Sequence, residues 1–476
     1  MDIAPPLLEV SKAHLENAFR ALKSASARSA VSDCAARQAQ LKALNRLLHA
    51  NRTDLSNAVS QDFGNRSLHE TQMLEIFPSL DAVKGALKHL RGWMKPQRGW
   101  ASMWFLPART EIRYQPLGVV GIIVPWNYPV LLAVAPLVAA LAAGNRVMIK
   151  MSEFTPHTGL LFAALMAKYF SPDVITVVNG GAETGKAFAS LPFDHLLFTG
   201  STAVGRHVMR AAADNLTPVT LELGGKSPVI IGADFPVALA AERIMWGKCL
   251  NAGQTCIAPD YVLLPGKSEA EFIAAARVAV AKLYPSLKDN PDYTSIVSDR
   301  HVQRLAGYLD DARAQGAAVS EINPAGEDLS GYRKVAPTLV TQVNDGMRIM
   351  QDEIFGPLLP LLAYESLDDA IRYVNEHPRP LALYYFGYDQ FSLERVLGET
   401  VTGGVTVNET ILHISQDDLP FGGVGPSGMG HYHGRFGFET FSKAKPVFRQ
   451  SRLNGLKLLH PPFGKRFDAM IKLLLR

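Results

Sequence analysis

One cysteine stands in a segment whose composition is unusual for a buried thiol. Cys256 lies in the stretch NAGQTCIAPD, among small and polar residues instead of Val, Leu and Ile. A buried cysteine is normally inert and packs among apolar side chains, whereas loops often carry the chemistry of a protein. The segment therefore makes Cys256 a candidate nucleophile, with an ordinary structural cysteine as the alternative.

The other two cysteines have blander surroundings. Cys249 lies in 241–250, which the sequence predicts to be helical, and Cys34 lies in an N-terminal helical region. Three cysteines in so long a chain do not make a disulfide framework, and no CxxC motif or His/Cys cluster with zinc spacing occurs. We therefore expect a cytoplasmic protein without a bound metal, in which these two cysteines are structural.

Two short segments supply groups that a reactive thiol needs. Glu222 lies in a hydrophobic strand within LELGGKSP, where burial raises the pKa of a carboxyl towards that of a useful base. Asn127 lies between prolines in PWNYP, so its amide is fixed and could donate to a developing oxyanion. The alternatives are a buried glutamate paired with Lys or Arg and an ordinary turn asparagine.

Two other segments have the chemistry of a dinucleotide site. In FTGSTAVGR, Gly200 and Ser201 follow a strand and open a helix; glycine allows close backbone approach, and helix N-terminal amides favour phosphate. In IKMSE, Lys150 and Glu153 follow another strand, where a carboxylate can accept hydrogen bonds from ribose hydroxyls. An ordinary strand-to-helix turn and a helix N-terminal acid are the alternatives.

Length and composition limit the class of protein. The 476 residues predict two or three domains at roughly 150 residues each. A hydrophobic content of 47% with 19% charged residues is ordinary for a globular protein. The net charge of +4, without basic clusters, is too weak for a nucleic-acid partner. The N-terminal MDIAPPLLEV lacks the features of a signal peptide.

The segment 117–145 carries no charge and is long enough to span a bilayer. Three prolines interrupt it, its part 118–124 is β-branched, and its part 130–143 is rich in alanine and ends at Gly144. We therefore predict a buried strand, a turn and a buried helix, and no membrane insertion.

The rest of the chain alternates between the two periodicities. Helices are predicted over 10–60, 70–95, 156–170 and 204–213, and strands over 146–150, 174–179, 195–198 and 219–223. Such alternation predicts a parallel sheet with covering helices, and a second α/β region is predicted over 225–410.

Two segments stand outside this pattern. The aromatic stretch 98–114 is predicted to be a hairpin or a subunit contact, with a surface loop as the alternative. The tail 453–476 is apolar and basic, so it either packs on its own or a partner subunit, which we prefer, or lies on a membrane surface.

Taken together, the motifs resemble those of the aldehyde dehydrogenase family. They match it in order and spacing over nearly the whole chain: Pro-Trp-Asn127, Phe-Thr-Gly200-Ser-Thr, Glu222-Leu-Gly-Gly-Lys, Asn-Ala-Gly-Gln-Thr-Cys256 and Glu353-Ile-Phe-Gly-Pro. The stretches LTPVTLE, APDY and PFGGVGPSGMGHYHG are similar to the class 3 branch. The stretch DFGNRSLHE, residues 62–70, resembles that of bacterial coniferyl aldehyde dehydrogenases in this branch.

The resemblance implies an α/β, aldehyde dehydrogenase-like fold in three parts. A Rossmann-type NAD(P)-binding domain would comprise 1–96 and 116–221, and a catalytic α/β domain would comprise 222–410. A small bridging or oligomerisation region, together with the C-terminal region, would comprise 97–115 and 411–476. Because class 3 relatives tend to be dimers, we expect a homodimer.

The resemblance also implies a reaction. Cys256 would attack an aldehyde, Asn127 and the Cys256 backbone N–H would hold the oxyanion of the thiohemiacetal, and Glu222 would activate the water that hydrolyses the thioester. The cofactor would be NAD, because the Glu153 carboxylate repels a 2′-phosphate, with NADP as the alternative. The cofactor-binding residues would be Lys150, Ser152, Glu153, Gly200, Ser201, Gly205, Leu223, Glu353 and Phe355.

The same resemblance places Tyr128, Phe421 and His413 along the aldehyde channel, with a packing role as the alternative for His413. The expected substrate is an aromatic phenylpropenal such as coniferyl aldehyde, and a long-chain aliphatic aldehyde is the alternative. A dehydrogenase that passes the acyl group to coenzyme A is a less favoured hypothesis. A cysteine hydrolase or a non-catalytic protein on the same scaffold is the hypothesis from a different class.

Overall fold

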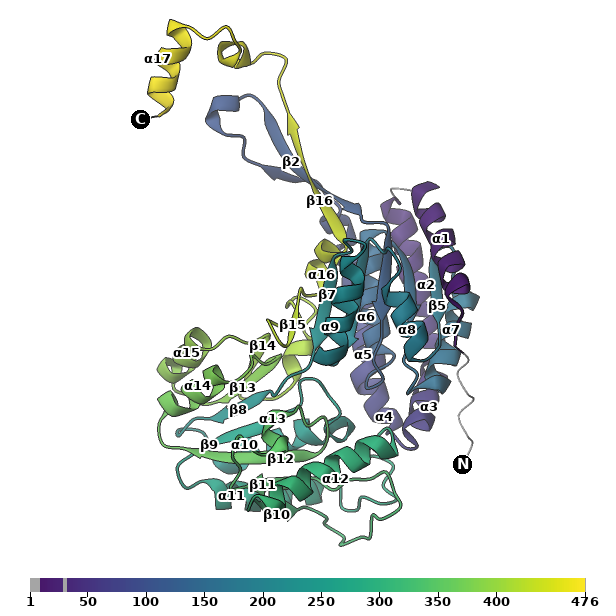
Figure 1. Ribbon diagram of the computed structural model, residues 1–476, viewed down its shortest axis with the longest axis vertical. Coiled ribbons are helices and arrows are strands. Elements are labelled where there is room, and N and C mark those ends of the chain that lie inside the picture. Colours follow the sequence, from purple (N-terminus) through teal and green to yellow (C-terminus); the bar gives the residue numbers. More distant parts are fainter. Residues whose placement is uncertain (1–8, 29–31, 476) are drawn as a thin grey trace.

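The computed structural model describes residues 9–28 and 32–475. Two α/β bodies are each built on a largely parallel sheet, and a slender arm projects from one of them (Figure 1). The chain crosses from the first sheet to the second between β7 and β8, and it returns to the first sheet with β15. Each body thus contains segments that are distant in the sequence.

The first body contains a six-stranded sheet in the order β15-β7-β6-β3-β4-β5, in which only β15 is antiparallel to its neighbour. The strands are β3 (Val119–Ile123), β4 (Arg146–Lys150), β5 (Ile175–Val178), β6 (His195–Gly200), β7 (Val219–Leu223) and β15 (Gly428–Met429). Because the other strands are parallel, the segments that follow them lie together at one edge of the sheet.

Helices cover both faces of this sheet. On β4, Val147 and Ile149 pack into the larger core, while Met148 packs into a smaller core on the opposite face. The smaller core contains residues of α1 (Lys12–Arg28), α8 (Ala182–Ala189) and α9 (Thr202–Ala213). The larger core contains residues of α2 (Cys34–Ala50), α3 (Arg52–Phe63), α5 (Phe77–Trp93), α6 (Leu131–Ala143), α7 (Pro156–Tyr169) and α16 (Gly434–Thr440).

The uncharged segment is an interior strand, turn and helix, as predicted. Twelve of the thirteen residues of α6 are buried, from Leu132 to Ala143. Gly144 ends the helix in the left-handed conformation, with a φ of 92°. Of the helices in the described part of the chain, none is both long and apolar enough to cross a membrane.

The second body contains a seven-stranded sheet in the order β10-β11-β12-β9-β8-β13-β14, parallel except between β10 and β11. Its strands are β8 (Pro228–Ile231), β9 (Tyr261–Pro265), β10 (Ala318–Glu321), β11 (Thr338–Thr341), β12 (Leu358–Tyr364), β13 (Ala382–Phe386) and β14 (Gly404–Val407). Its helices are α10 (Val237–Cys249), α11 (Glu269–Leu283), α12 (Asp299–Ala314), α13 (Arg348–Gln351), α14 (Leu367–Glu376) and α15 (Gln390–Glu399).

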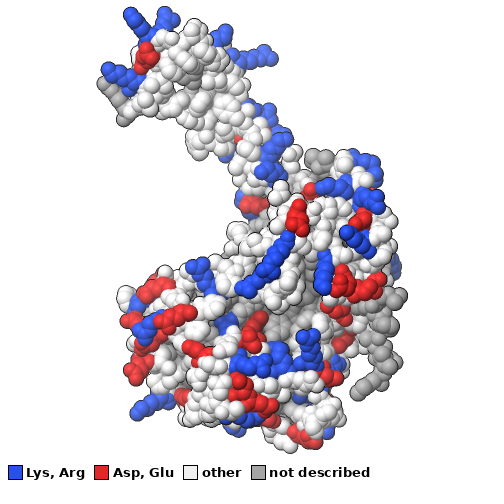
Figure 2. Space-filling model, viewed as in Figure 1, with Lys and Arg blue, Asp and Glu red and all other residues white. Residues whose placement is uncertain are grey.

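The arm is an antiparallel sheet of β1 (Gln97–Gly99), β2 (Arg109–Pro116) and β16 (Ser442–Arg449), with the short helix η2 (Met103–Phe105) at its tip. The pairing of β1 with β2 confirms the predicted hairpin. Beyond β16, the helices η5 (Leu456–Leu459) and α17 (Lys465–Leu474) lie at the outer end of the molecule (Figure 1). The visible surface of the arm is largely uncharged; its charged side chains are mainly basic and lie at its outer end and along the part that joins it to the body (Figure 2).

The predicted elements are confirmed with small shifts at their ends. β4 and β7 have the predicted bounds, whereas α9 begins at Thr202 instead of 204, because Ser201 caps it by accepting a hydrogen bond from the Val204 N–H. The predicted helical region 70–95 contains the end of α4 (Leu68–Thr71), the π-helix η1 (Gln72–Ile76) and α5. Cys249 is the buried last residue of α10, as expected of a structural cysteine.

Candidate active site

The loop that carries Cys256 has an unusual backbone. After α10, the short helix η3 (Leu250–Gly253) places Asn251, Ala252 and Gly253 at φ values of 50°, 50° and 74°. A Cβ atom on Gly253 would lie 2.3 Å from the carbonyl oxygen of Gly356, so only glycine fits there. This tight loop holds Cys256 between the two bodies, with its side chain partly buried against the larger core.

Glu222 lies against the thiol of Cys256. It is the fourth residue of β7, is 1% exposed, and has no hydrogen-bond partner for either carboxyl oxygen among the described residues. Burial raises the pKa of Glu222 to about 8, and the nearby Cys256 thiol and Thr199 hydroxyl oppose this rise. Glu222 forms no ion pair with a lysine or arginine in the part of the chain that the structure describes, so the alternative of a paired buried glutamate does not apply to it.

The thiol is itself difficult to ionise in this setting. Burial, with the nearby carboxyls of Glu222 and Glu353, raises the pKa of Cys256 well above its usual value. Attack on a carbonyl therefore requires a group that takes the thiol proton, and Glu222 is the carboxyl in contact with it.

Asn127 lies on the other side of the loop. It is 3% exposed, and its side-chain Nδ2 donates a hydrogen bond of 3.2 Å to the carbonyl of Gln254, two residues before Cys256. The hydroxyl of Tyr128 lies 2.7 Å from the Thr255 hydroxyl. The PWNYP turn therefore contacts the loop that carries Cys256 at two consecutive residues, Gln254 and Thr255.

The predicted cofactor residues follow the carboxyl ends of β4 and β6. Lys150 is buried, and its Nζ lies 2.9 Å from the Glu153 carboxylate. Ser152 is buried beside them. Gly200 ends β6, Ser201 caps α9, and a Cβ on Gly205 would lie 2.7 Å from Leu223, so this glycine lets helix α9 pack closely on β7.

Glu353 completes this half of the site. A Cβ on Gly224 would lie 2.1 Å from its carboxylate, so the glycine makes room for it. Burial, with the nearby Asp260, raises the pKa of Glu353 to about 8, and its Oε1 has no hydrogen-bond partner among the described residues. Phe355 packs edge-on against Trp126 at 5.3 Å. The unpartnered carboxyl oxygen of Glu353 fits a sugar hydroxyl, and the N-terminus of α9 fits a phosphate of a dinucleotide.

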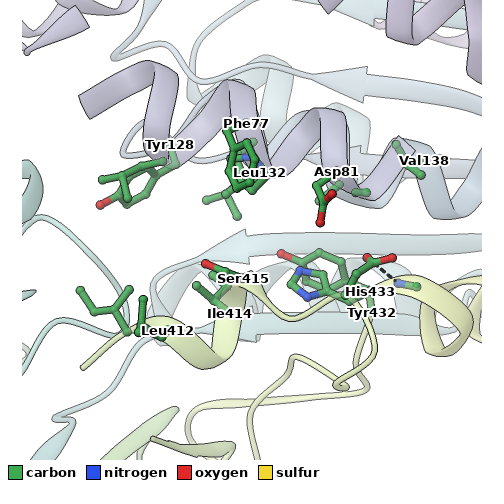
Figure 3. Close-up of a pocket in the computed structure, with 18 of the residues that line it drawn as sticks. Phe77, Asp81, Tyr128, Leu132, Val138, Leu412, Ile414, Ser415, Tyr432 and His433 are labelled. Atoms are coloured by element: carbon green, nitrogen blue, oxygen red, sulfur yellow. Dashed lines mark hydrogen bonds between the residues drawn. The ribbon is translucent and has the colours of Figure 1, made fainter. Parts of the chain in front are cut away.

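A cavity of about 1180 Å³, including space open to solvent, leads to Cys256, and its lining does not include the predicted cofactor residues. One wall comes from η1, α5 and α6, and the other from η4 (Leu412–Ser415) and the segment 432–434 (Figure 3). Most of the lining is apolar, including Met73, Phe77, Leu132, Val138, Trp246, Ile411 and Ile414. Asp81 and Asp417 are the two carboxylates in it, and Asp81 points into the space between the walls (Figure 3).

Comparison with known proteins identifies the family of this chain. The sequence pattern of the aldehyde dehydrogenase family matches residues 6–447. The chain belongs to the aldehyde dehydrogenase family. This aldehyde dehydrogenase is 54% identical over 463 residues to a probable coniferyl aldehyde dehydrogenase of Pseudomonas aeruginosa, covering 97% of this chain and 96% of that protein. It is 40% identical over 432 residues to rat aldehyde dehydrogenase family 3 member A2, covering 89% and 86%.

Solved structures of relatives have the same fold. A substrate-bound Staphylococcus aureus AldH superimposes with a TM-score of 0.91 at 38% identity, covering 97% of this chain and 99% of that one. A Pseudomonas syringae indole-3-acetaldehyde dehydrogenase in complex with NAD⁺ gives 0.84 at 26% identity, covering 93% and 90%. This aldehyde dehydrogenase therefore oxidises an aldehyde to an acid with NAD or NADP, and it resembles the class 3 members of its family.

Two predicted channel residues lie behind the cavity wall. Tyr128 lines the cavity, whereas Phe421 and His413 are not among its described lining residues. Phe421 instead stacks on the lining residue His433 with ring centroids 5.4 Å apart. His413 Nδ1 lies 2.8 Å from the Thr406 hydroxyl, and burial lowers the pKa of this histidine to about 4. Contact of these two residues with an aldehyde stays a prediction.

Sequence reasoning missed other residues of the cavity. Tyr432 and His433 lie within the quoted PFGGVGPSGMGHYHG motif, yet only its Phe421 was assigned to the channel. The Tyr432 hydroxyl is buried without a partner among the described residues, and burial, with the nearby Glu222 and Cys256, raises its pKa well above its usual value. Phe77 and Asp81 share one face of α5 at a spacing of four residues, a signal that the sequence did contain.

Proposed function

We propose that this aldehyde dehydrogenase oxidises an aromatic phenylpropenal, such as coniferyl aldehyde, to its carboxylic acid with NAD. The single observation that carries the proposal is the apolar cavity that leads to Cys256 and contains two carboxylates. Relatives named coniferyl aldehyde dehydrogenase or probable coniferyl aldehyde dehydrogenase, at 52–54% identity, support the same substrate class.

In the proposed mechanism, Cys256 attacks the aldehyde carbon while Glu222 takes the thiol proton. The oxyanion that forms is held by the Asn127 side chain and the Cys256 backbone N–H. When bound, the nicotinamide supplies a hydride acceptor, and loss of the hydride leaves a thioester on Cys256. Contact between Glu222 and Cys256 supports the proton transfer.

The thioester is then hydrolysed. Glu222 first releases the thiol proton to solvent. It then accepts a proton from a water molecule as the water oxygen attacks the thioester carbonyl, and this proton passes to the departing Cys256 thiolate, so that the acid and the thiol are released. A pKa of about 8 makes Glu222 basic enough for this step and still ionised in part at neutral pH. This base also argues against a coenzyme A-acylating enzyme, because hydrolysis would consume the thioester before transfer. A product assay with and without coenzyme A separates the two.

For the cofactor, we assign the nicotinamide ribose to Glu353, with Phe355 and Leu223 beside it. Lys150, Ser152 and Glu153 would hold the adenosine ribose, and Gly200, Ser201 and Gly205 would let α9 face the pyrophosphate. The pairing of Lys150 with Glu153 supports NAD over NADP, because the carboxylate would repel a 2′-phosphate. A lower KM for NAD than for NADP is the expected result.

The acidic groups favour a phenolic substrate over a fatty one. Asp81 lies one helical turn beyond Phe77 on α5, roughly 6 Å further along the cavity. Burial, with the nearby Asp418 and Asp81, raises the pKa of Asp417 to about 6. A phenol hydroxyl can donate to such carboxylates, whereas an alkyl tail would desolvate them without compensation. A long-chain aliphatic aldehyde remains the second candidate, because the rest of the lining is apolar.

We also propose that the protein is a cytoplasmic homodimer that associates through the arm. Large apolar side chains are exposed there, including Trp100, Met103, Trp104, Leu106 and Phe448. Their burial against a second copy would remove a sizeable apolar surface from water. Light scattering should give twice the mass of the chain, and a monomeric mass would contradict this proposal.

The test of the function is absorbance of NADH with purified protein, NAD and a panel of aldehydes. The panel runs from acetaldehyde through long-chain aldehydes to cinnamaldehyde and coniferyl aldehyde. We expect the highest kcat/KM with the phenylpropenals, and a preference for long aliphatic aldehydes would exclude the aromatic assignment. No NADH with any aldehyde would contradict the proposed reaction and return attention to a cysteine hydrolase or a non-catalytic role.

A further inference from the structure

The segment 62–70, which the mechanism does not use, contacts the loop that carries Cys256 through Glu70, which accepts a hydrogen bond from the Asn251 backbone N–H. Arg66 in this segment is 1% exposed, and its Nη1 donates to the Glu75 carboxylate at 2.8 Å and to the Asn127 carbonyl at 3.1 Å. A buried guanidinium is costly unless its partners are well placed, so its presence here requires a reason.

The partner of Arg66 fixes the same turn from its other end. The second carboxylate oxygen of Glu75 accepts hydrogen bonds from the backbone N–H groups of Val130 and Leu131, at 2.7 and 3.0 Å. These amides begin α6, where a negative charge is favoured. The ion pair therefore holds Asn127 by its carbonyl and the start of α6 by its amides, with charge-assisted hydrogen bonds.

The Asn127 carbonyl also connects this pair to the catalytic loop. Asn251 Nδ2 donates to the Asn127 carbonyl at 3.1 Å and to the Gln254 carbonyl at 3.0 Å. The Gln254 carbonyl accepts in addition from Asn127 Nδ2. Glu70 accepts from the Asn251 backbone N–H and from the Thr294 hydroxyl. The Asn127 amide and the Cys256 loop thus share one buried hydrogen-bond network.

A second contact runs through an aromatic ring. The Arg66 guanidinium lies 4.8 Å from the centroid of the Tyr128 ring, and the Tyr128 hydroxyl contacts Thr255, which precedes Cys256. Guanidinium groups are attracted to such ring faces. Arg66 therefore contacts two consecutive residues of the turn that faces the nucleophile.

We infer that Arg66 is a positioning residue, which holds the Asn127 amide where it meets the oxyanion formed on Cys256. The inference rests on the proposed roles of Cys256 and Asn127. The inference predicts an effect on only one class of thiol reaction. Loss of Arg66 impairs reactions of the thiol that pass through a tetrahedral oxyanion and spares those that do not.

Two reactions of the thiol separate these cases without any cofactor. 4-Nitrophenyl acetate acylates the thiolate through a tetrahedral oxyanion and releases 4-nitrophenolate, whereas iodoacetamide alkylates it by displacement of iodide without an oxyanion. We expect Arg66→Met to lower the acylation rate about 10- to 100-fold. The alkylation rate should change less than about threefold, because no oxyanion forms.

Arg37→Met is the matched control. Arg37 is 2% exposed and donates to the Ala142 carbonyl at 2.9 Å, at the opposite end of α6. Its loss should leave the ratio of acylation to alkylation at the wild-type value. If Arg37→Met lowers the ratio as much as Arg66→Met, or if Arg66→Met lowers both rates equally, Arg66 is merely structural and the inference is wrong.

Further variants keep the test decisive. Arg66→Lys should recover most of the ratio, because an ammonium group can still donate to Glu75 and Asn127. The double variant Arg66→Met with Glu75→Gln leaves no unpaired buried charge, so it tests the ratio if the single variant does not fold. In an Asn127→Ala background, Arg66→Met should lower the ratio no further. An additional fall there would mean that Arg66 does not act through Asn127.

The same assay distinguishes failure of the inference from failure of the proposed function. If wild type is not acylated, or if Cys256→Ser is acylated equally fast, then Cys256 is not the nucleophile. If wild type is acylated and Arg66→Met keeps the wild-type ratio, only the role of Arg66 is wrong.

Discussion

The loop that carries Cys256 lies near two polar regions that are similarly buried and differently paired. Beneath it, Glu75 has a guanidinium and two backbone N–H groups as partners. Above it, Glu222 has no hydrogen-bond partner among the described residues, and Glu353 has one free carboxyl oxygen.

The difference follows from what each region has to do. A paired carboxylate is stable and holds its neighbours in place, but its lone pairs are already used. An unpaired one is costly to bury, and its raised pKa keeps it able to accept a proton. The structure thus pairs the carboxylate of Glu75 and leaves the carboxyl group of Glu222 without a hydrogen-bond partner among the described residues, which suits the roles proposed for them.

The largest expected effect is on kcat/KM, and it comes from the region where Cys256 lies near the unpaired Glu222. Cys256→Ser should lower kcat/KM by at least about 10³-fold, because a hydroxyl in this apolar site is a far weaker nucleophile than a thiolate. NADH formation with the best aldehyde measures it. Cys249→Ser is the control, since Cys249 is buried at the end of α10 and should keep near-normal activity per folded molecule.

Glu222→Gln should impair hydrolysis of the thioester by roughly 10²- to 10⁴-fold, because a general base is lost. Because Glu222 also takes the thiol proton, single-turnover experiments should show slower formation of acyl-enzyme in the variant, and the acyl-enzyme that does form should persist. In wild type, the hydrolysis rate should rise with pH and level off above about 8, where Glu222 is ionised. A rate independent of pH between 6 and 9 would contradict the role of Glu222 as the base.

The free energy of unfolding should fall more when Glu75 is replaced than when Glu222 is replaced. Glu75→Ala leaves the Arg66 guanidinium and two backbone N–H groups without their acceptor, so it should lower the free energy of unfolding by about 3–5 kcal/mol. Glu222→Gln should change that free energy by less than about 1 kcal/mol near pH 6, where the wild-type carboxyl is mainly protonated. Urea denaturation of both variants measures the difference. Equal losses of unfolding free energy would contradict the contrast between the paired Glu75 and the unpaired Glu222.

The pH dependence of stability sharpens the same contrast. The pKa of Glu222 is raised from 4.5 to about 8, so between these values the folded protein keeps a proton that the unfolded chain has lost. This contribution is fully present below pH 4.5 and is lost as the pH rises through 8. Wild type should therefore lose stability relative to Glu222→Gln over this range, and parallel curves would show that Glu222 does not carry the shift.

The smallest expected effect concerns the substrate. The double variant Asp81→Asn with Asp417→Asn should reduce the preference for coniferyl aldehyde over unsubstituted cinnamaldehyde by about tenfold, the value of one hydrogen bond to a charged group. The ratio of the two kcat/KM values measures it, and Asp418→Asn, which lies outside the cavity lining, is the control. An unchanged ratio would remove the carboxylates from substrate recognition.

The sequence by itself determined the elements and predicted which groups react. The β-branched and alanine-rich runs of 117–145 defined β3 and α6, because apolar runs of these lengths bury themselves in a predictable form. The composition around Cys256 marked it as reactive, and the strand that carries Glu222 implied its burial. The division into three domains and the roles of the individual site residues stay predictions.

Only the tertiary structure decided which groups meet. Arg66, Glu75 and Asn127 come from three segments, and no local pattern reveals that one guanidinium joins two of them. The lining of the cavity could not be predicted from the sequence either. Asp81 and Asp417 are more than 300 residues apart and come together only through the return of the chain to the first body. Periodicity reports which face of an element is buried, whereas the partner on that face depends on the packing of whole elements.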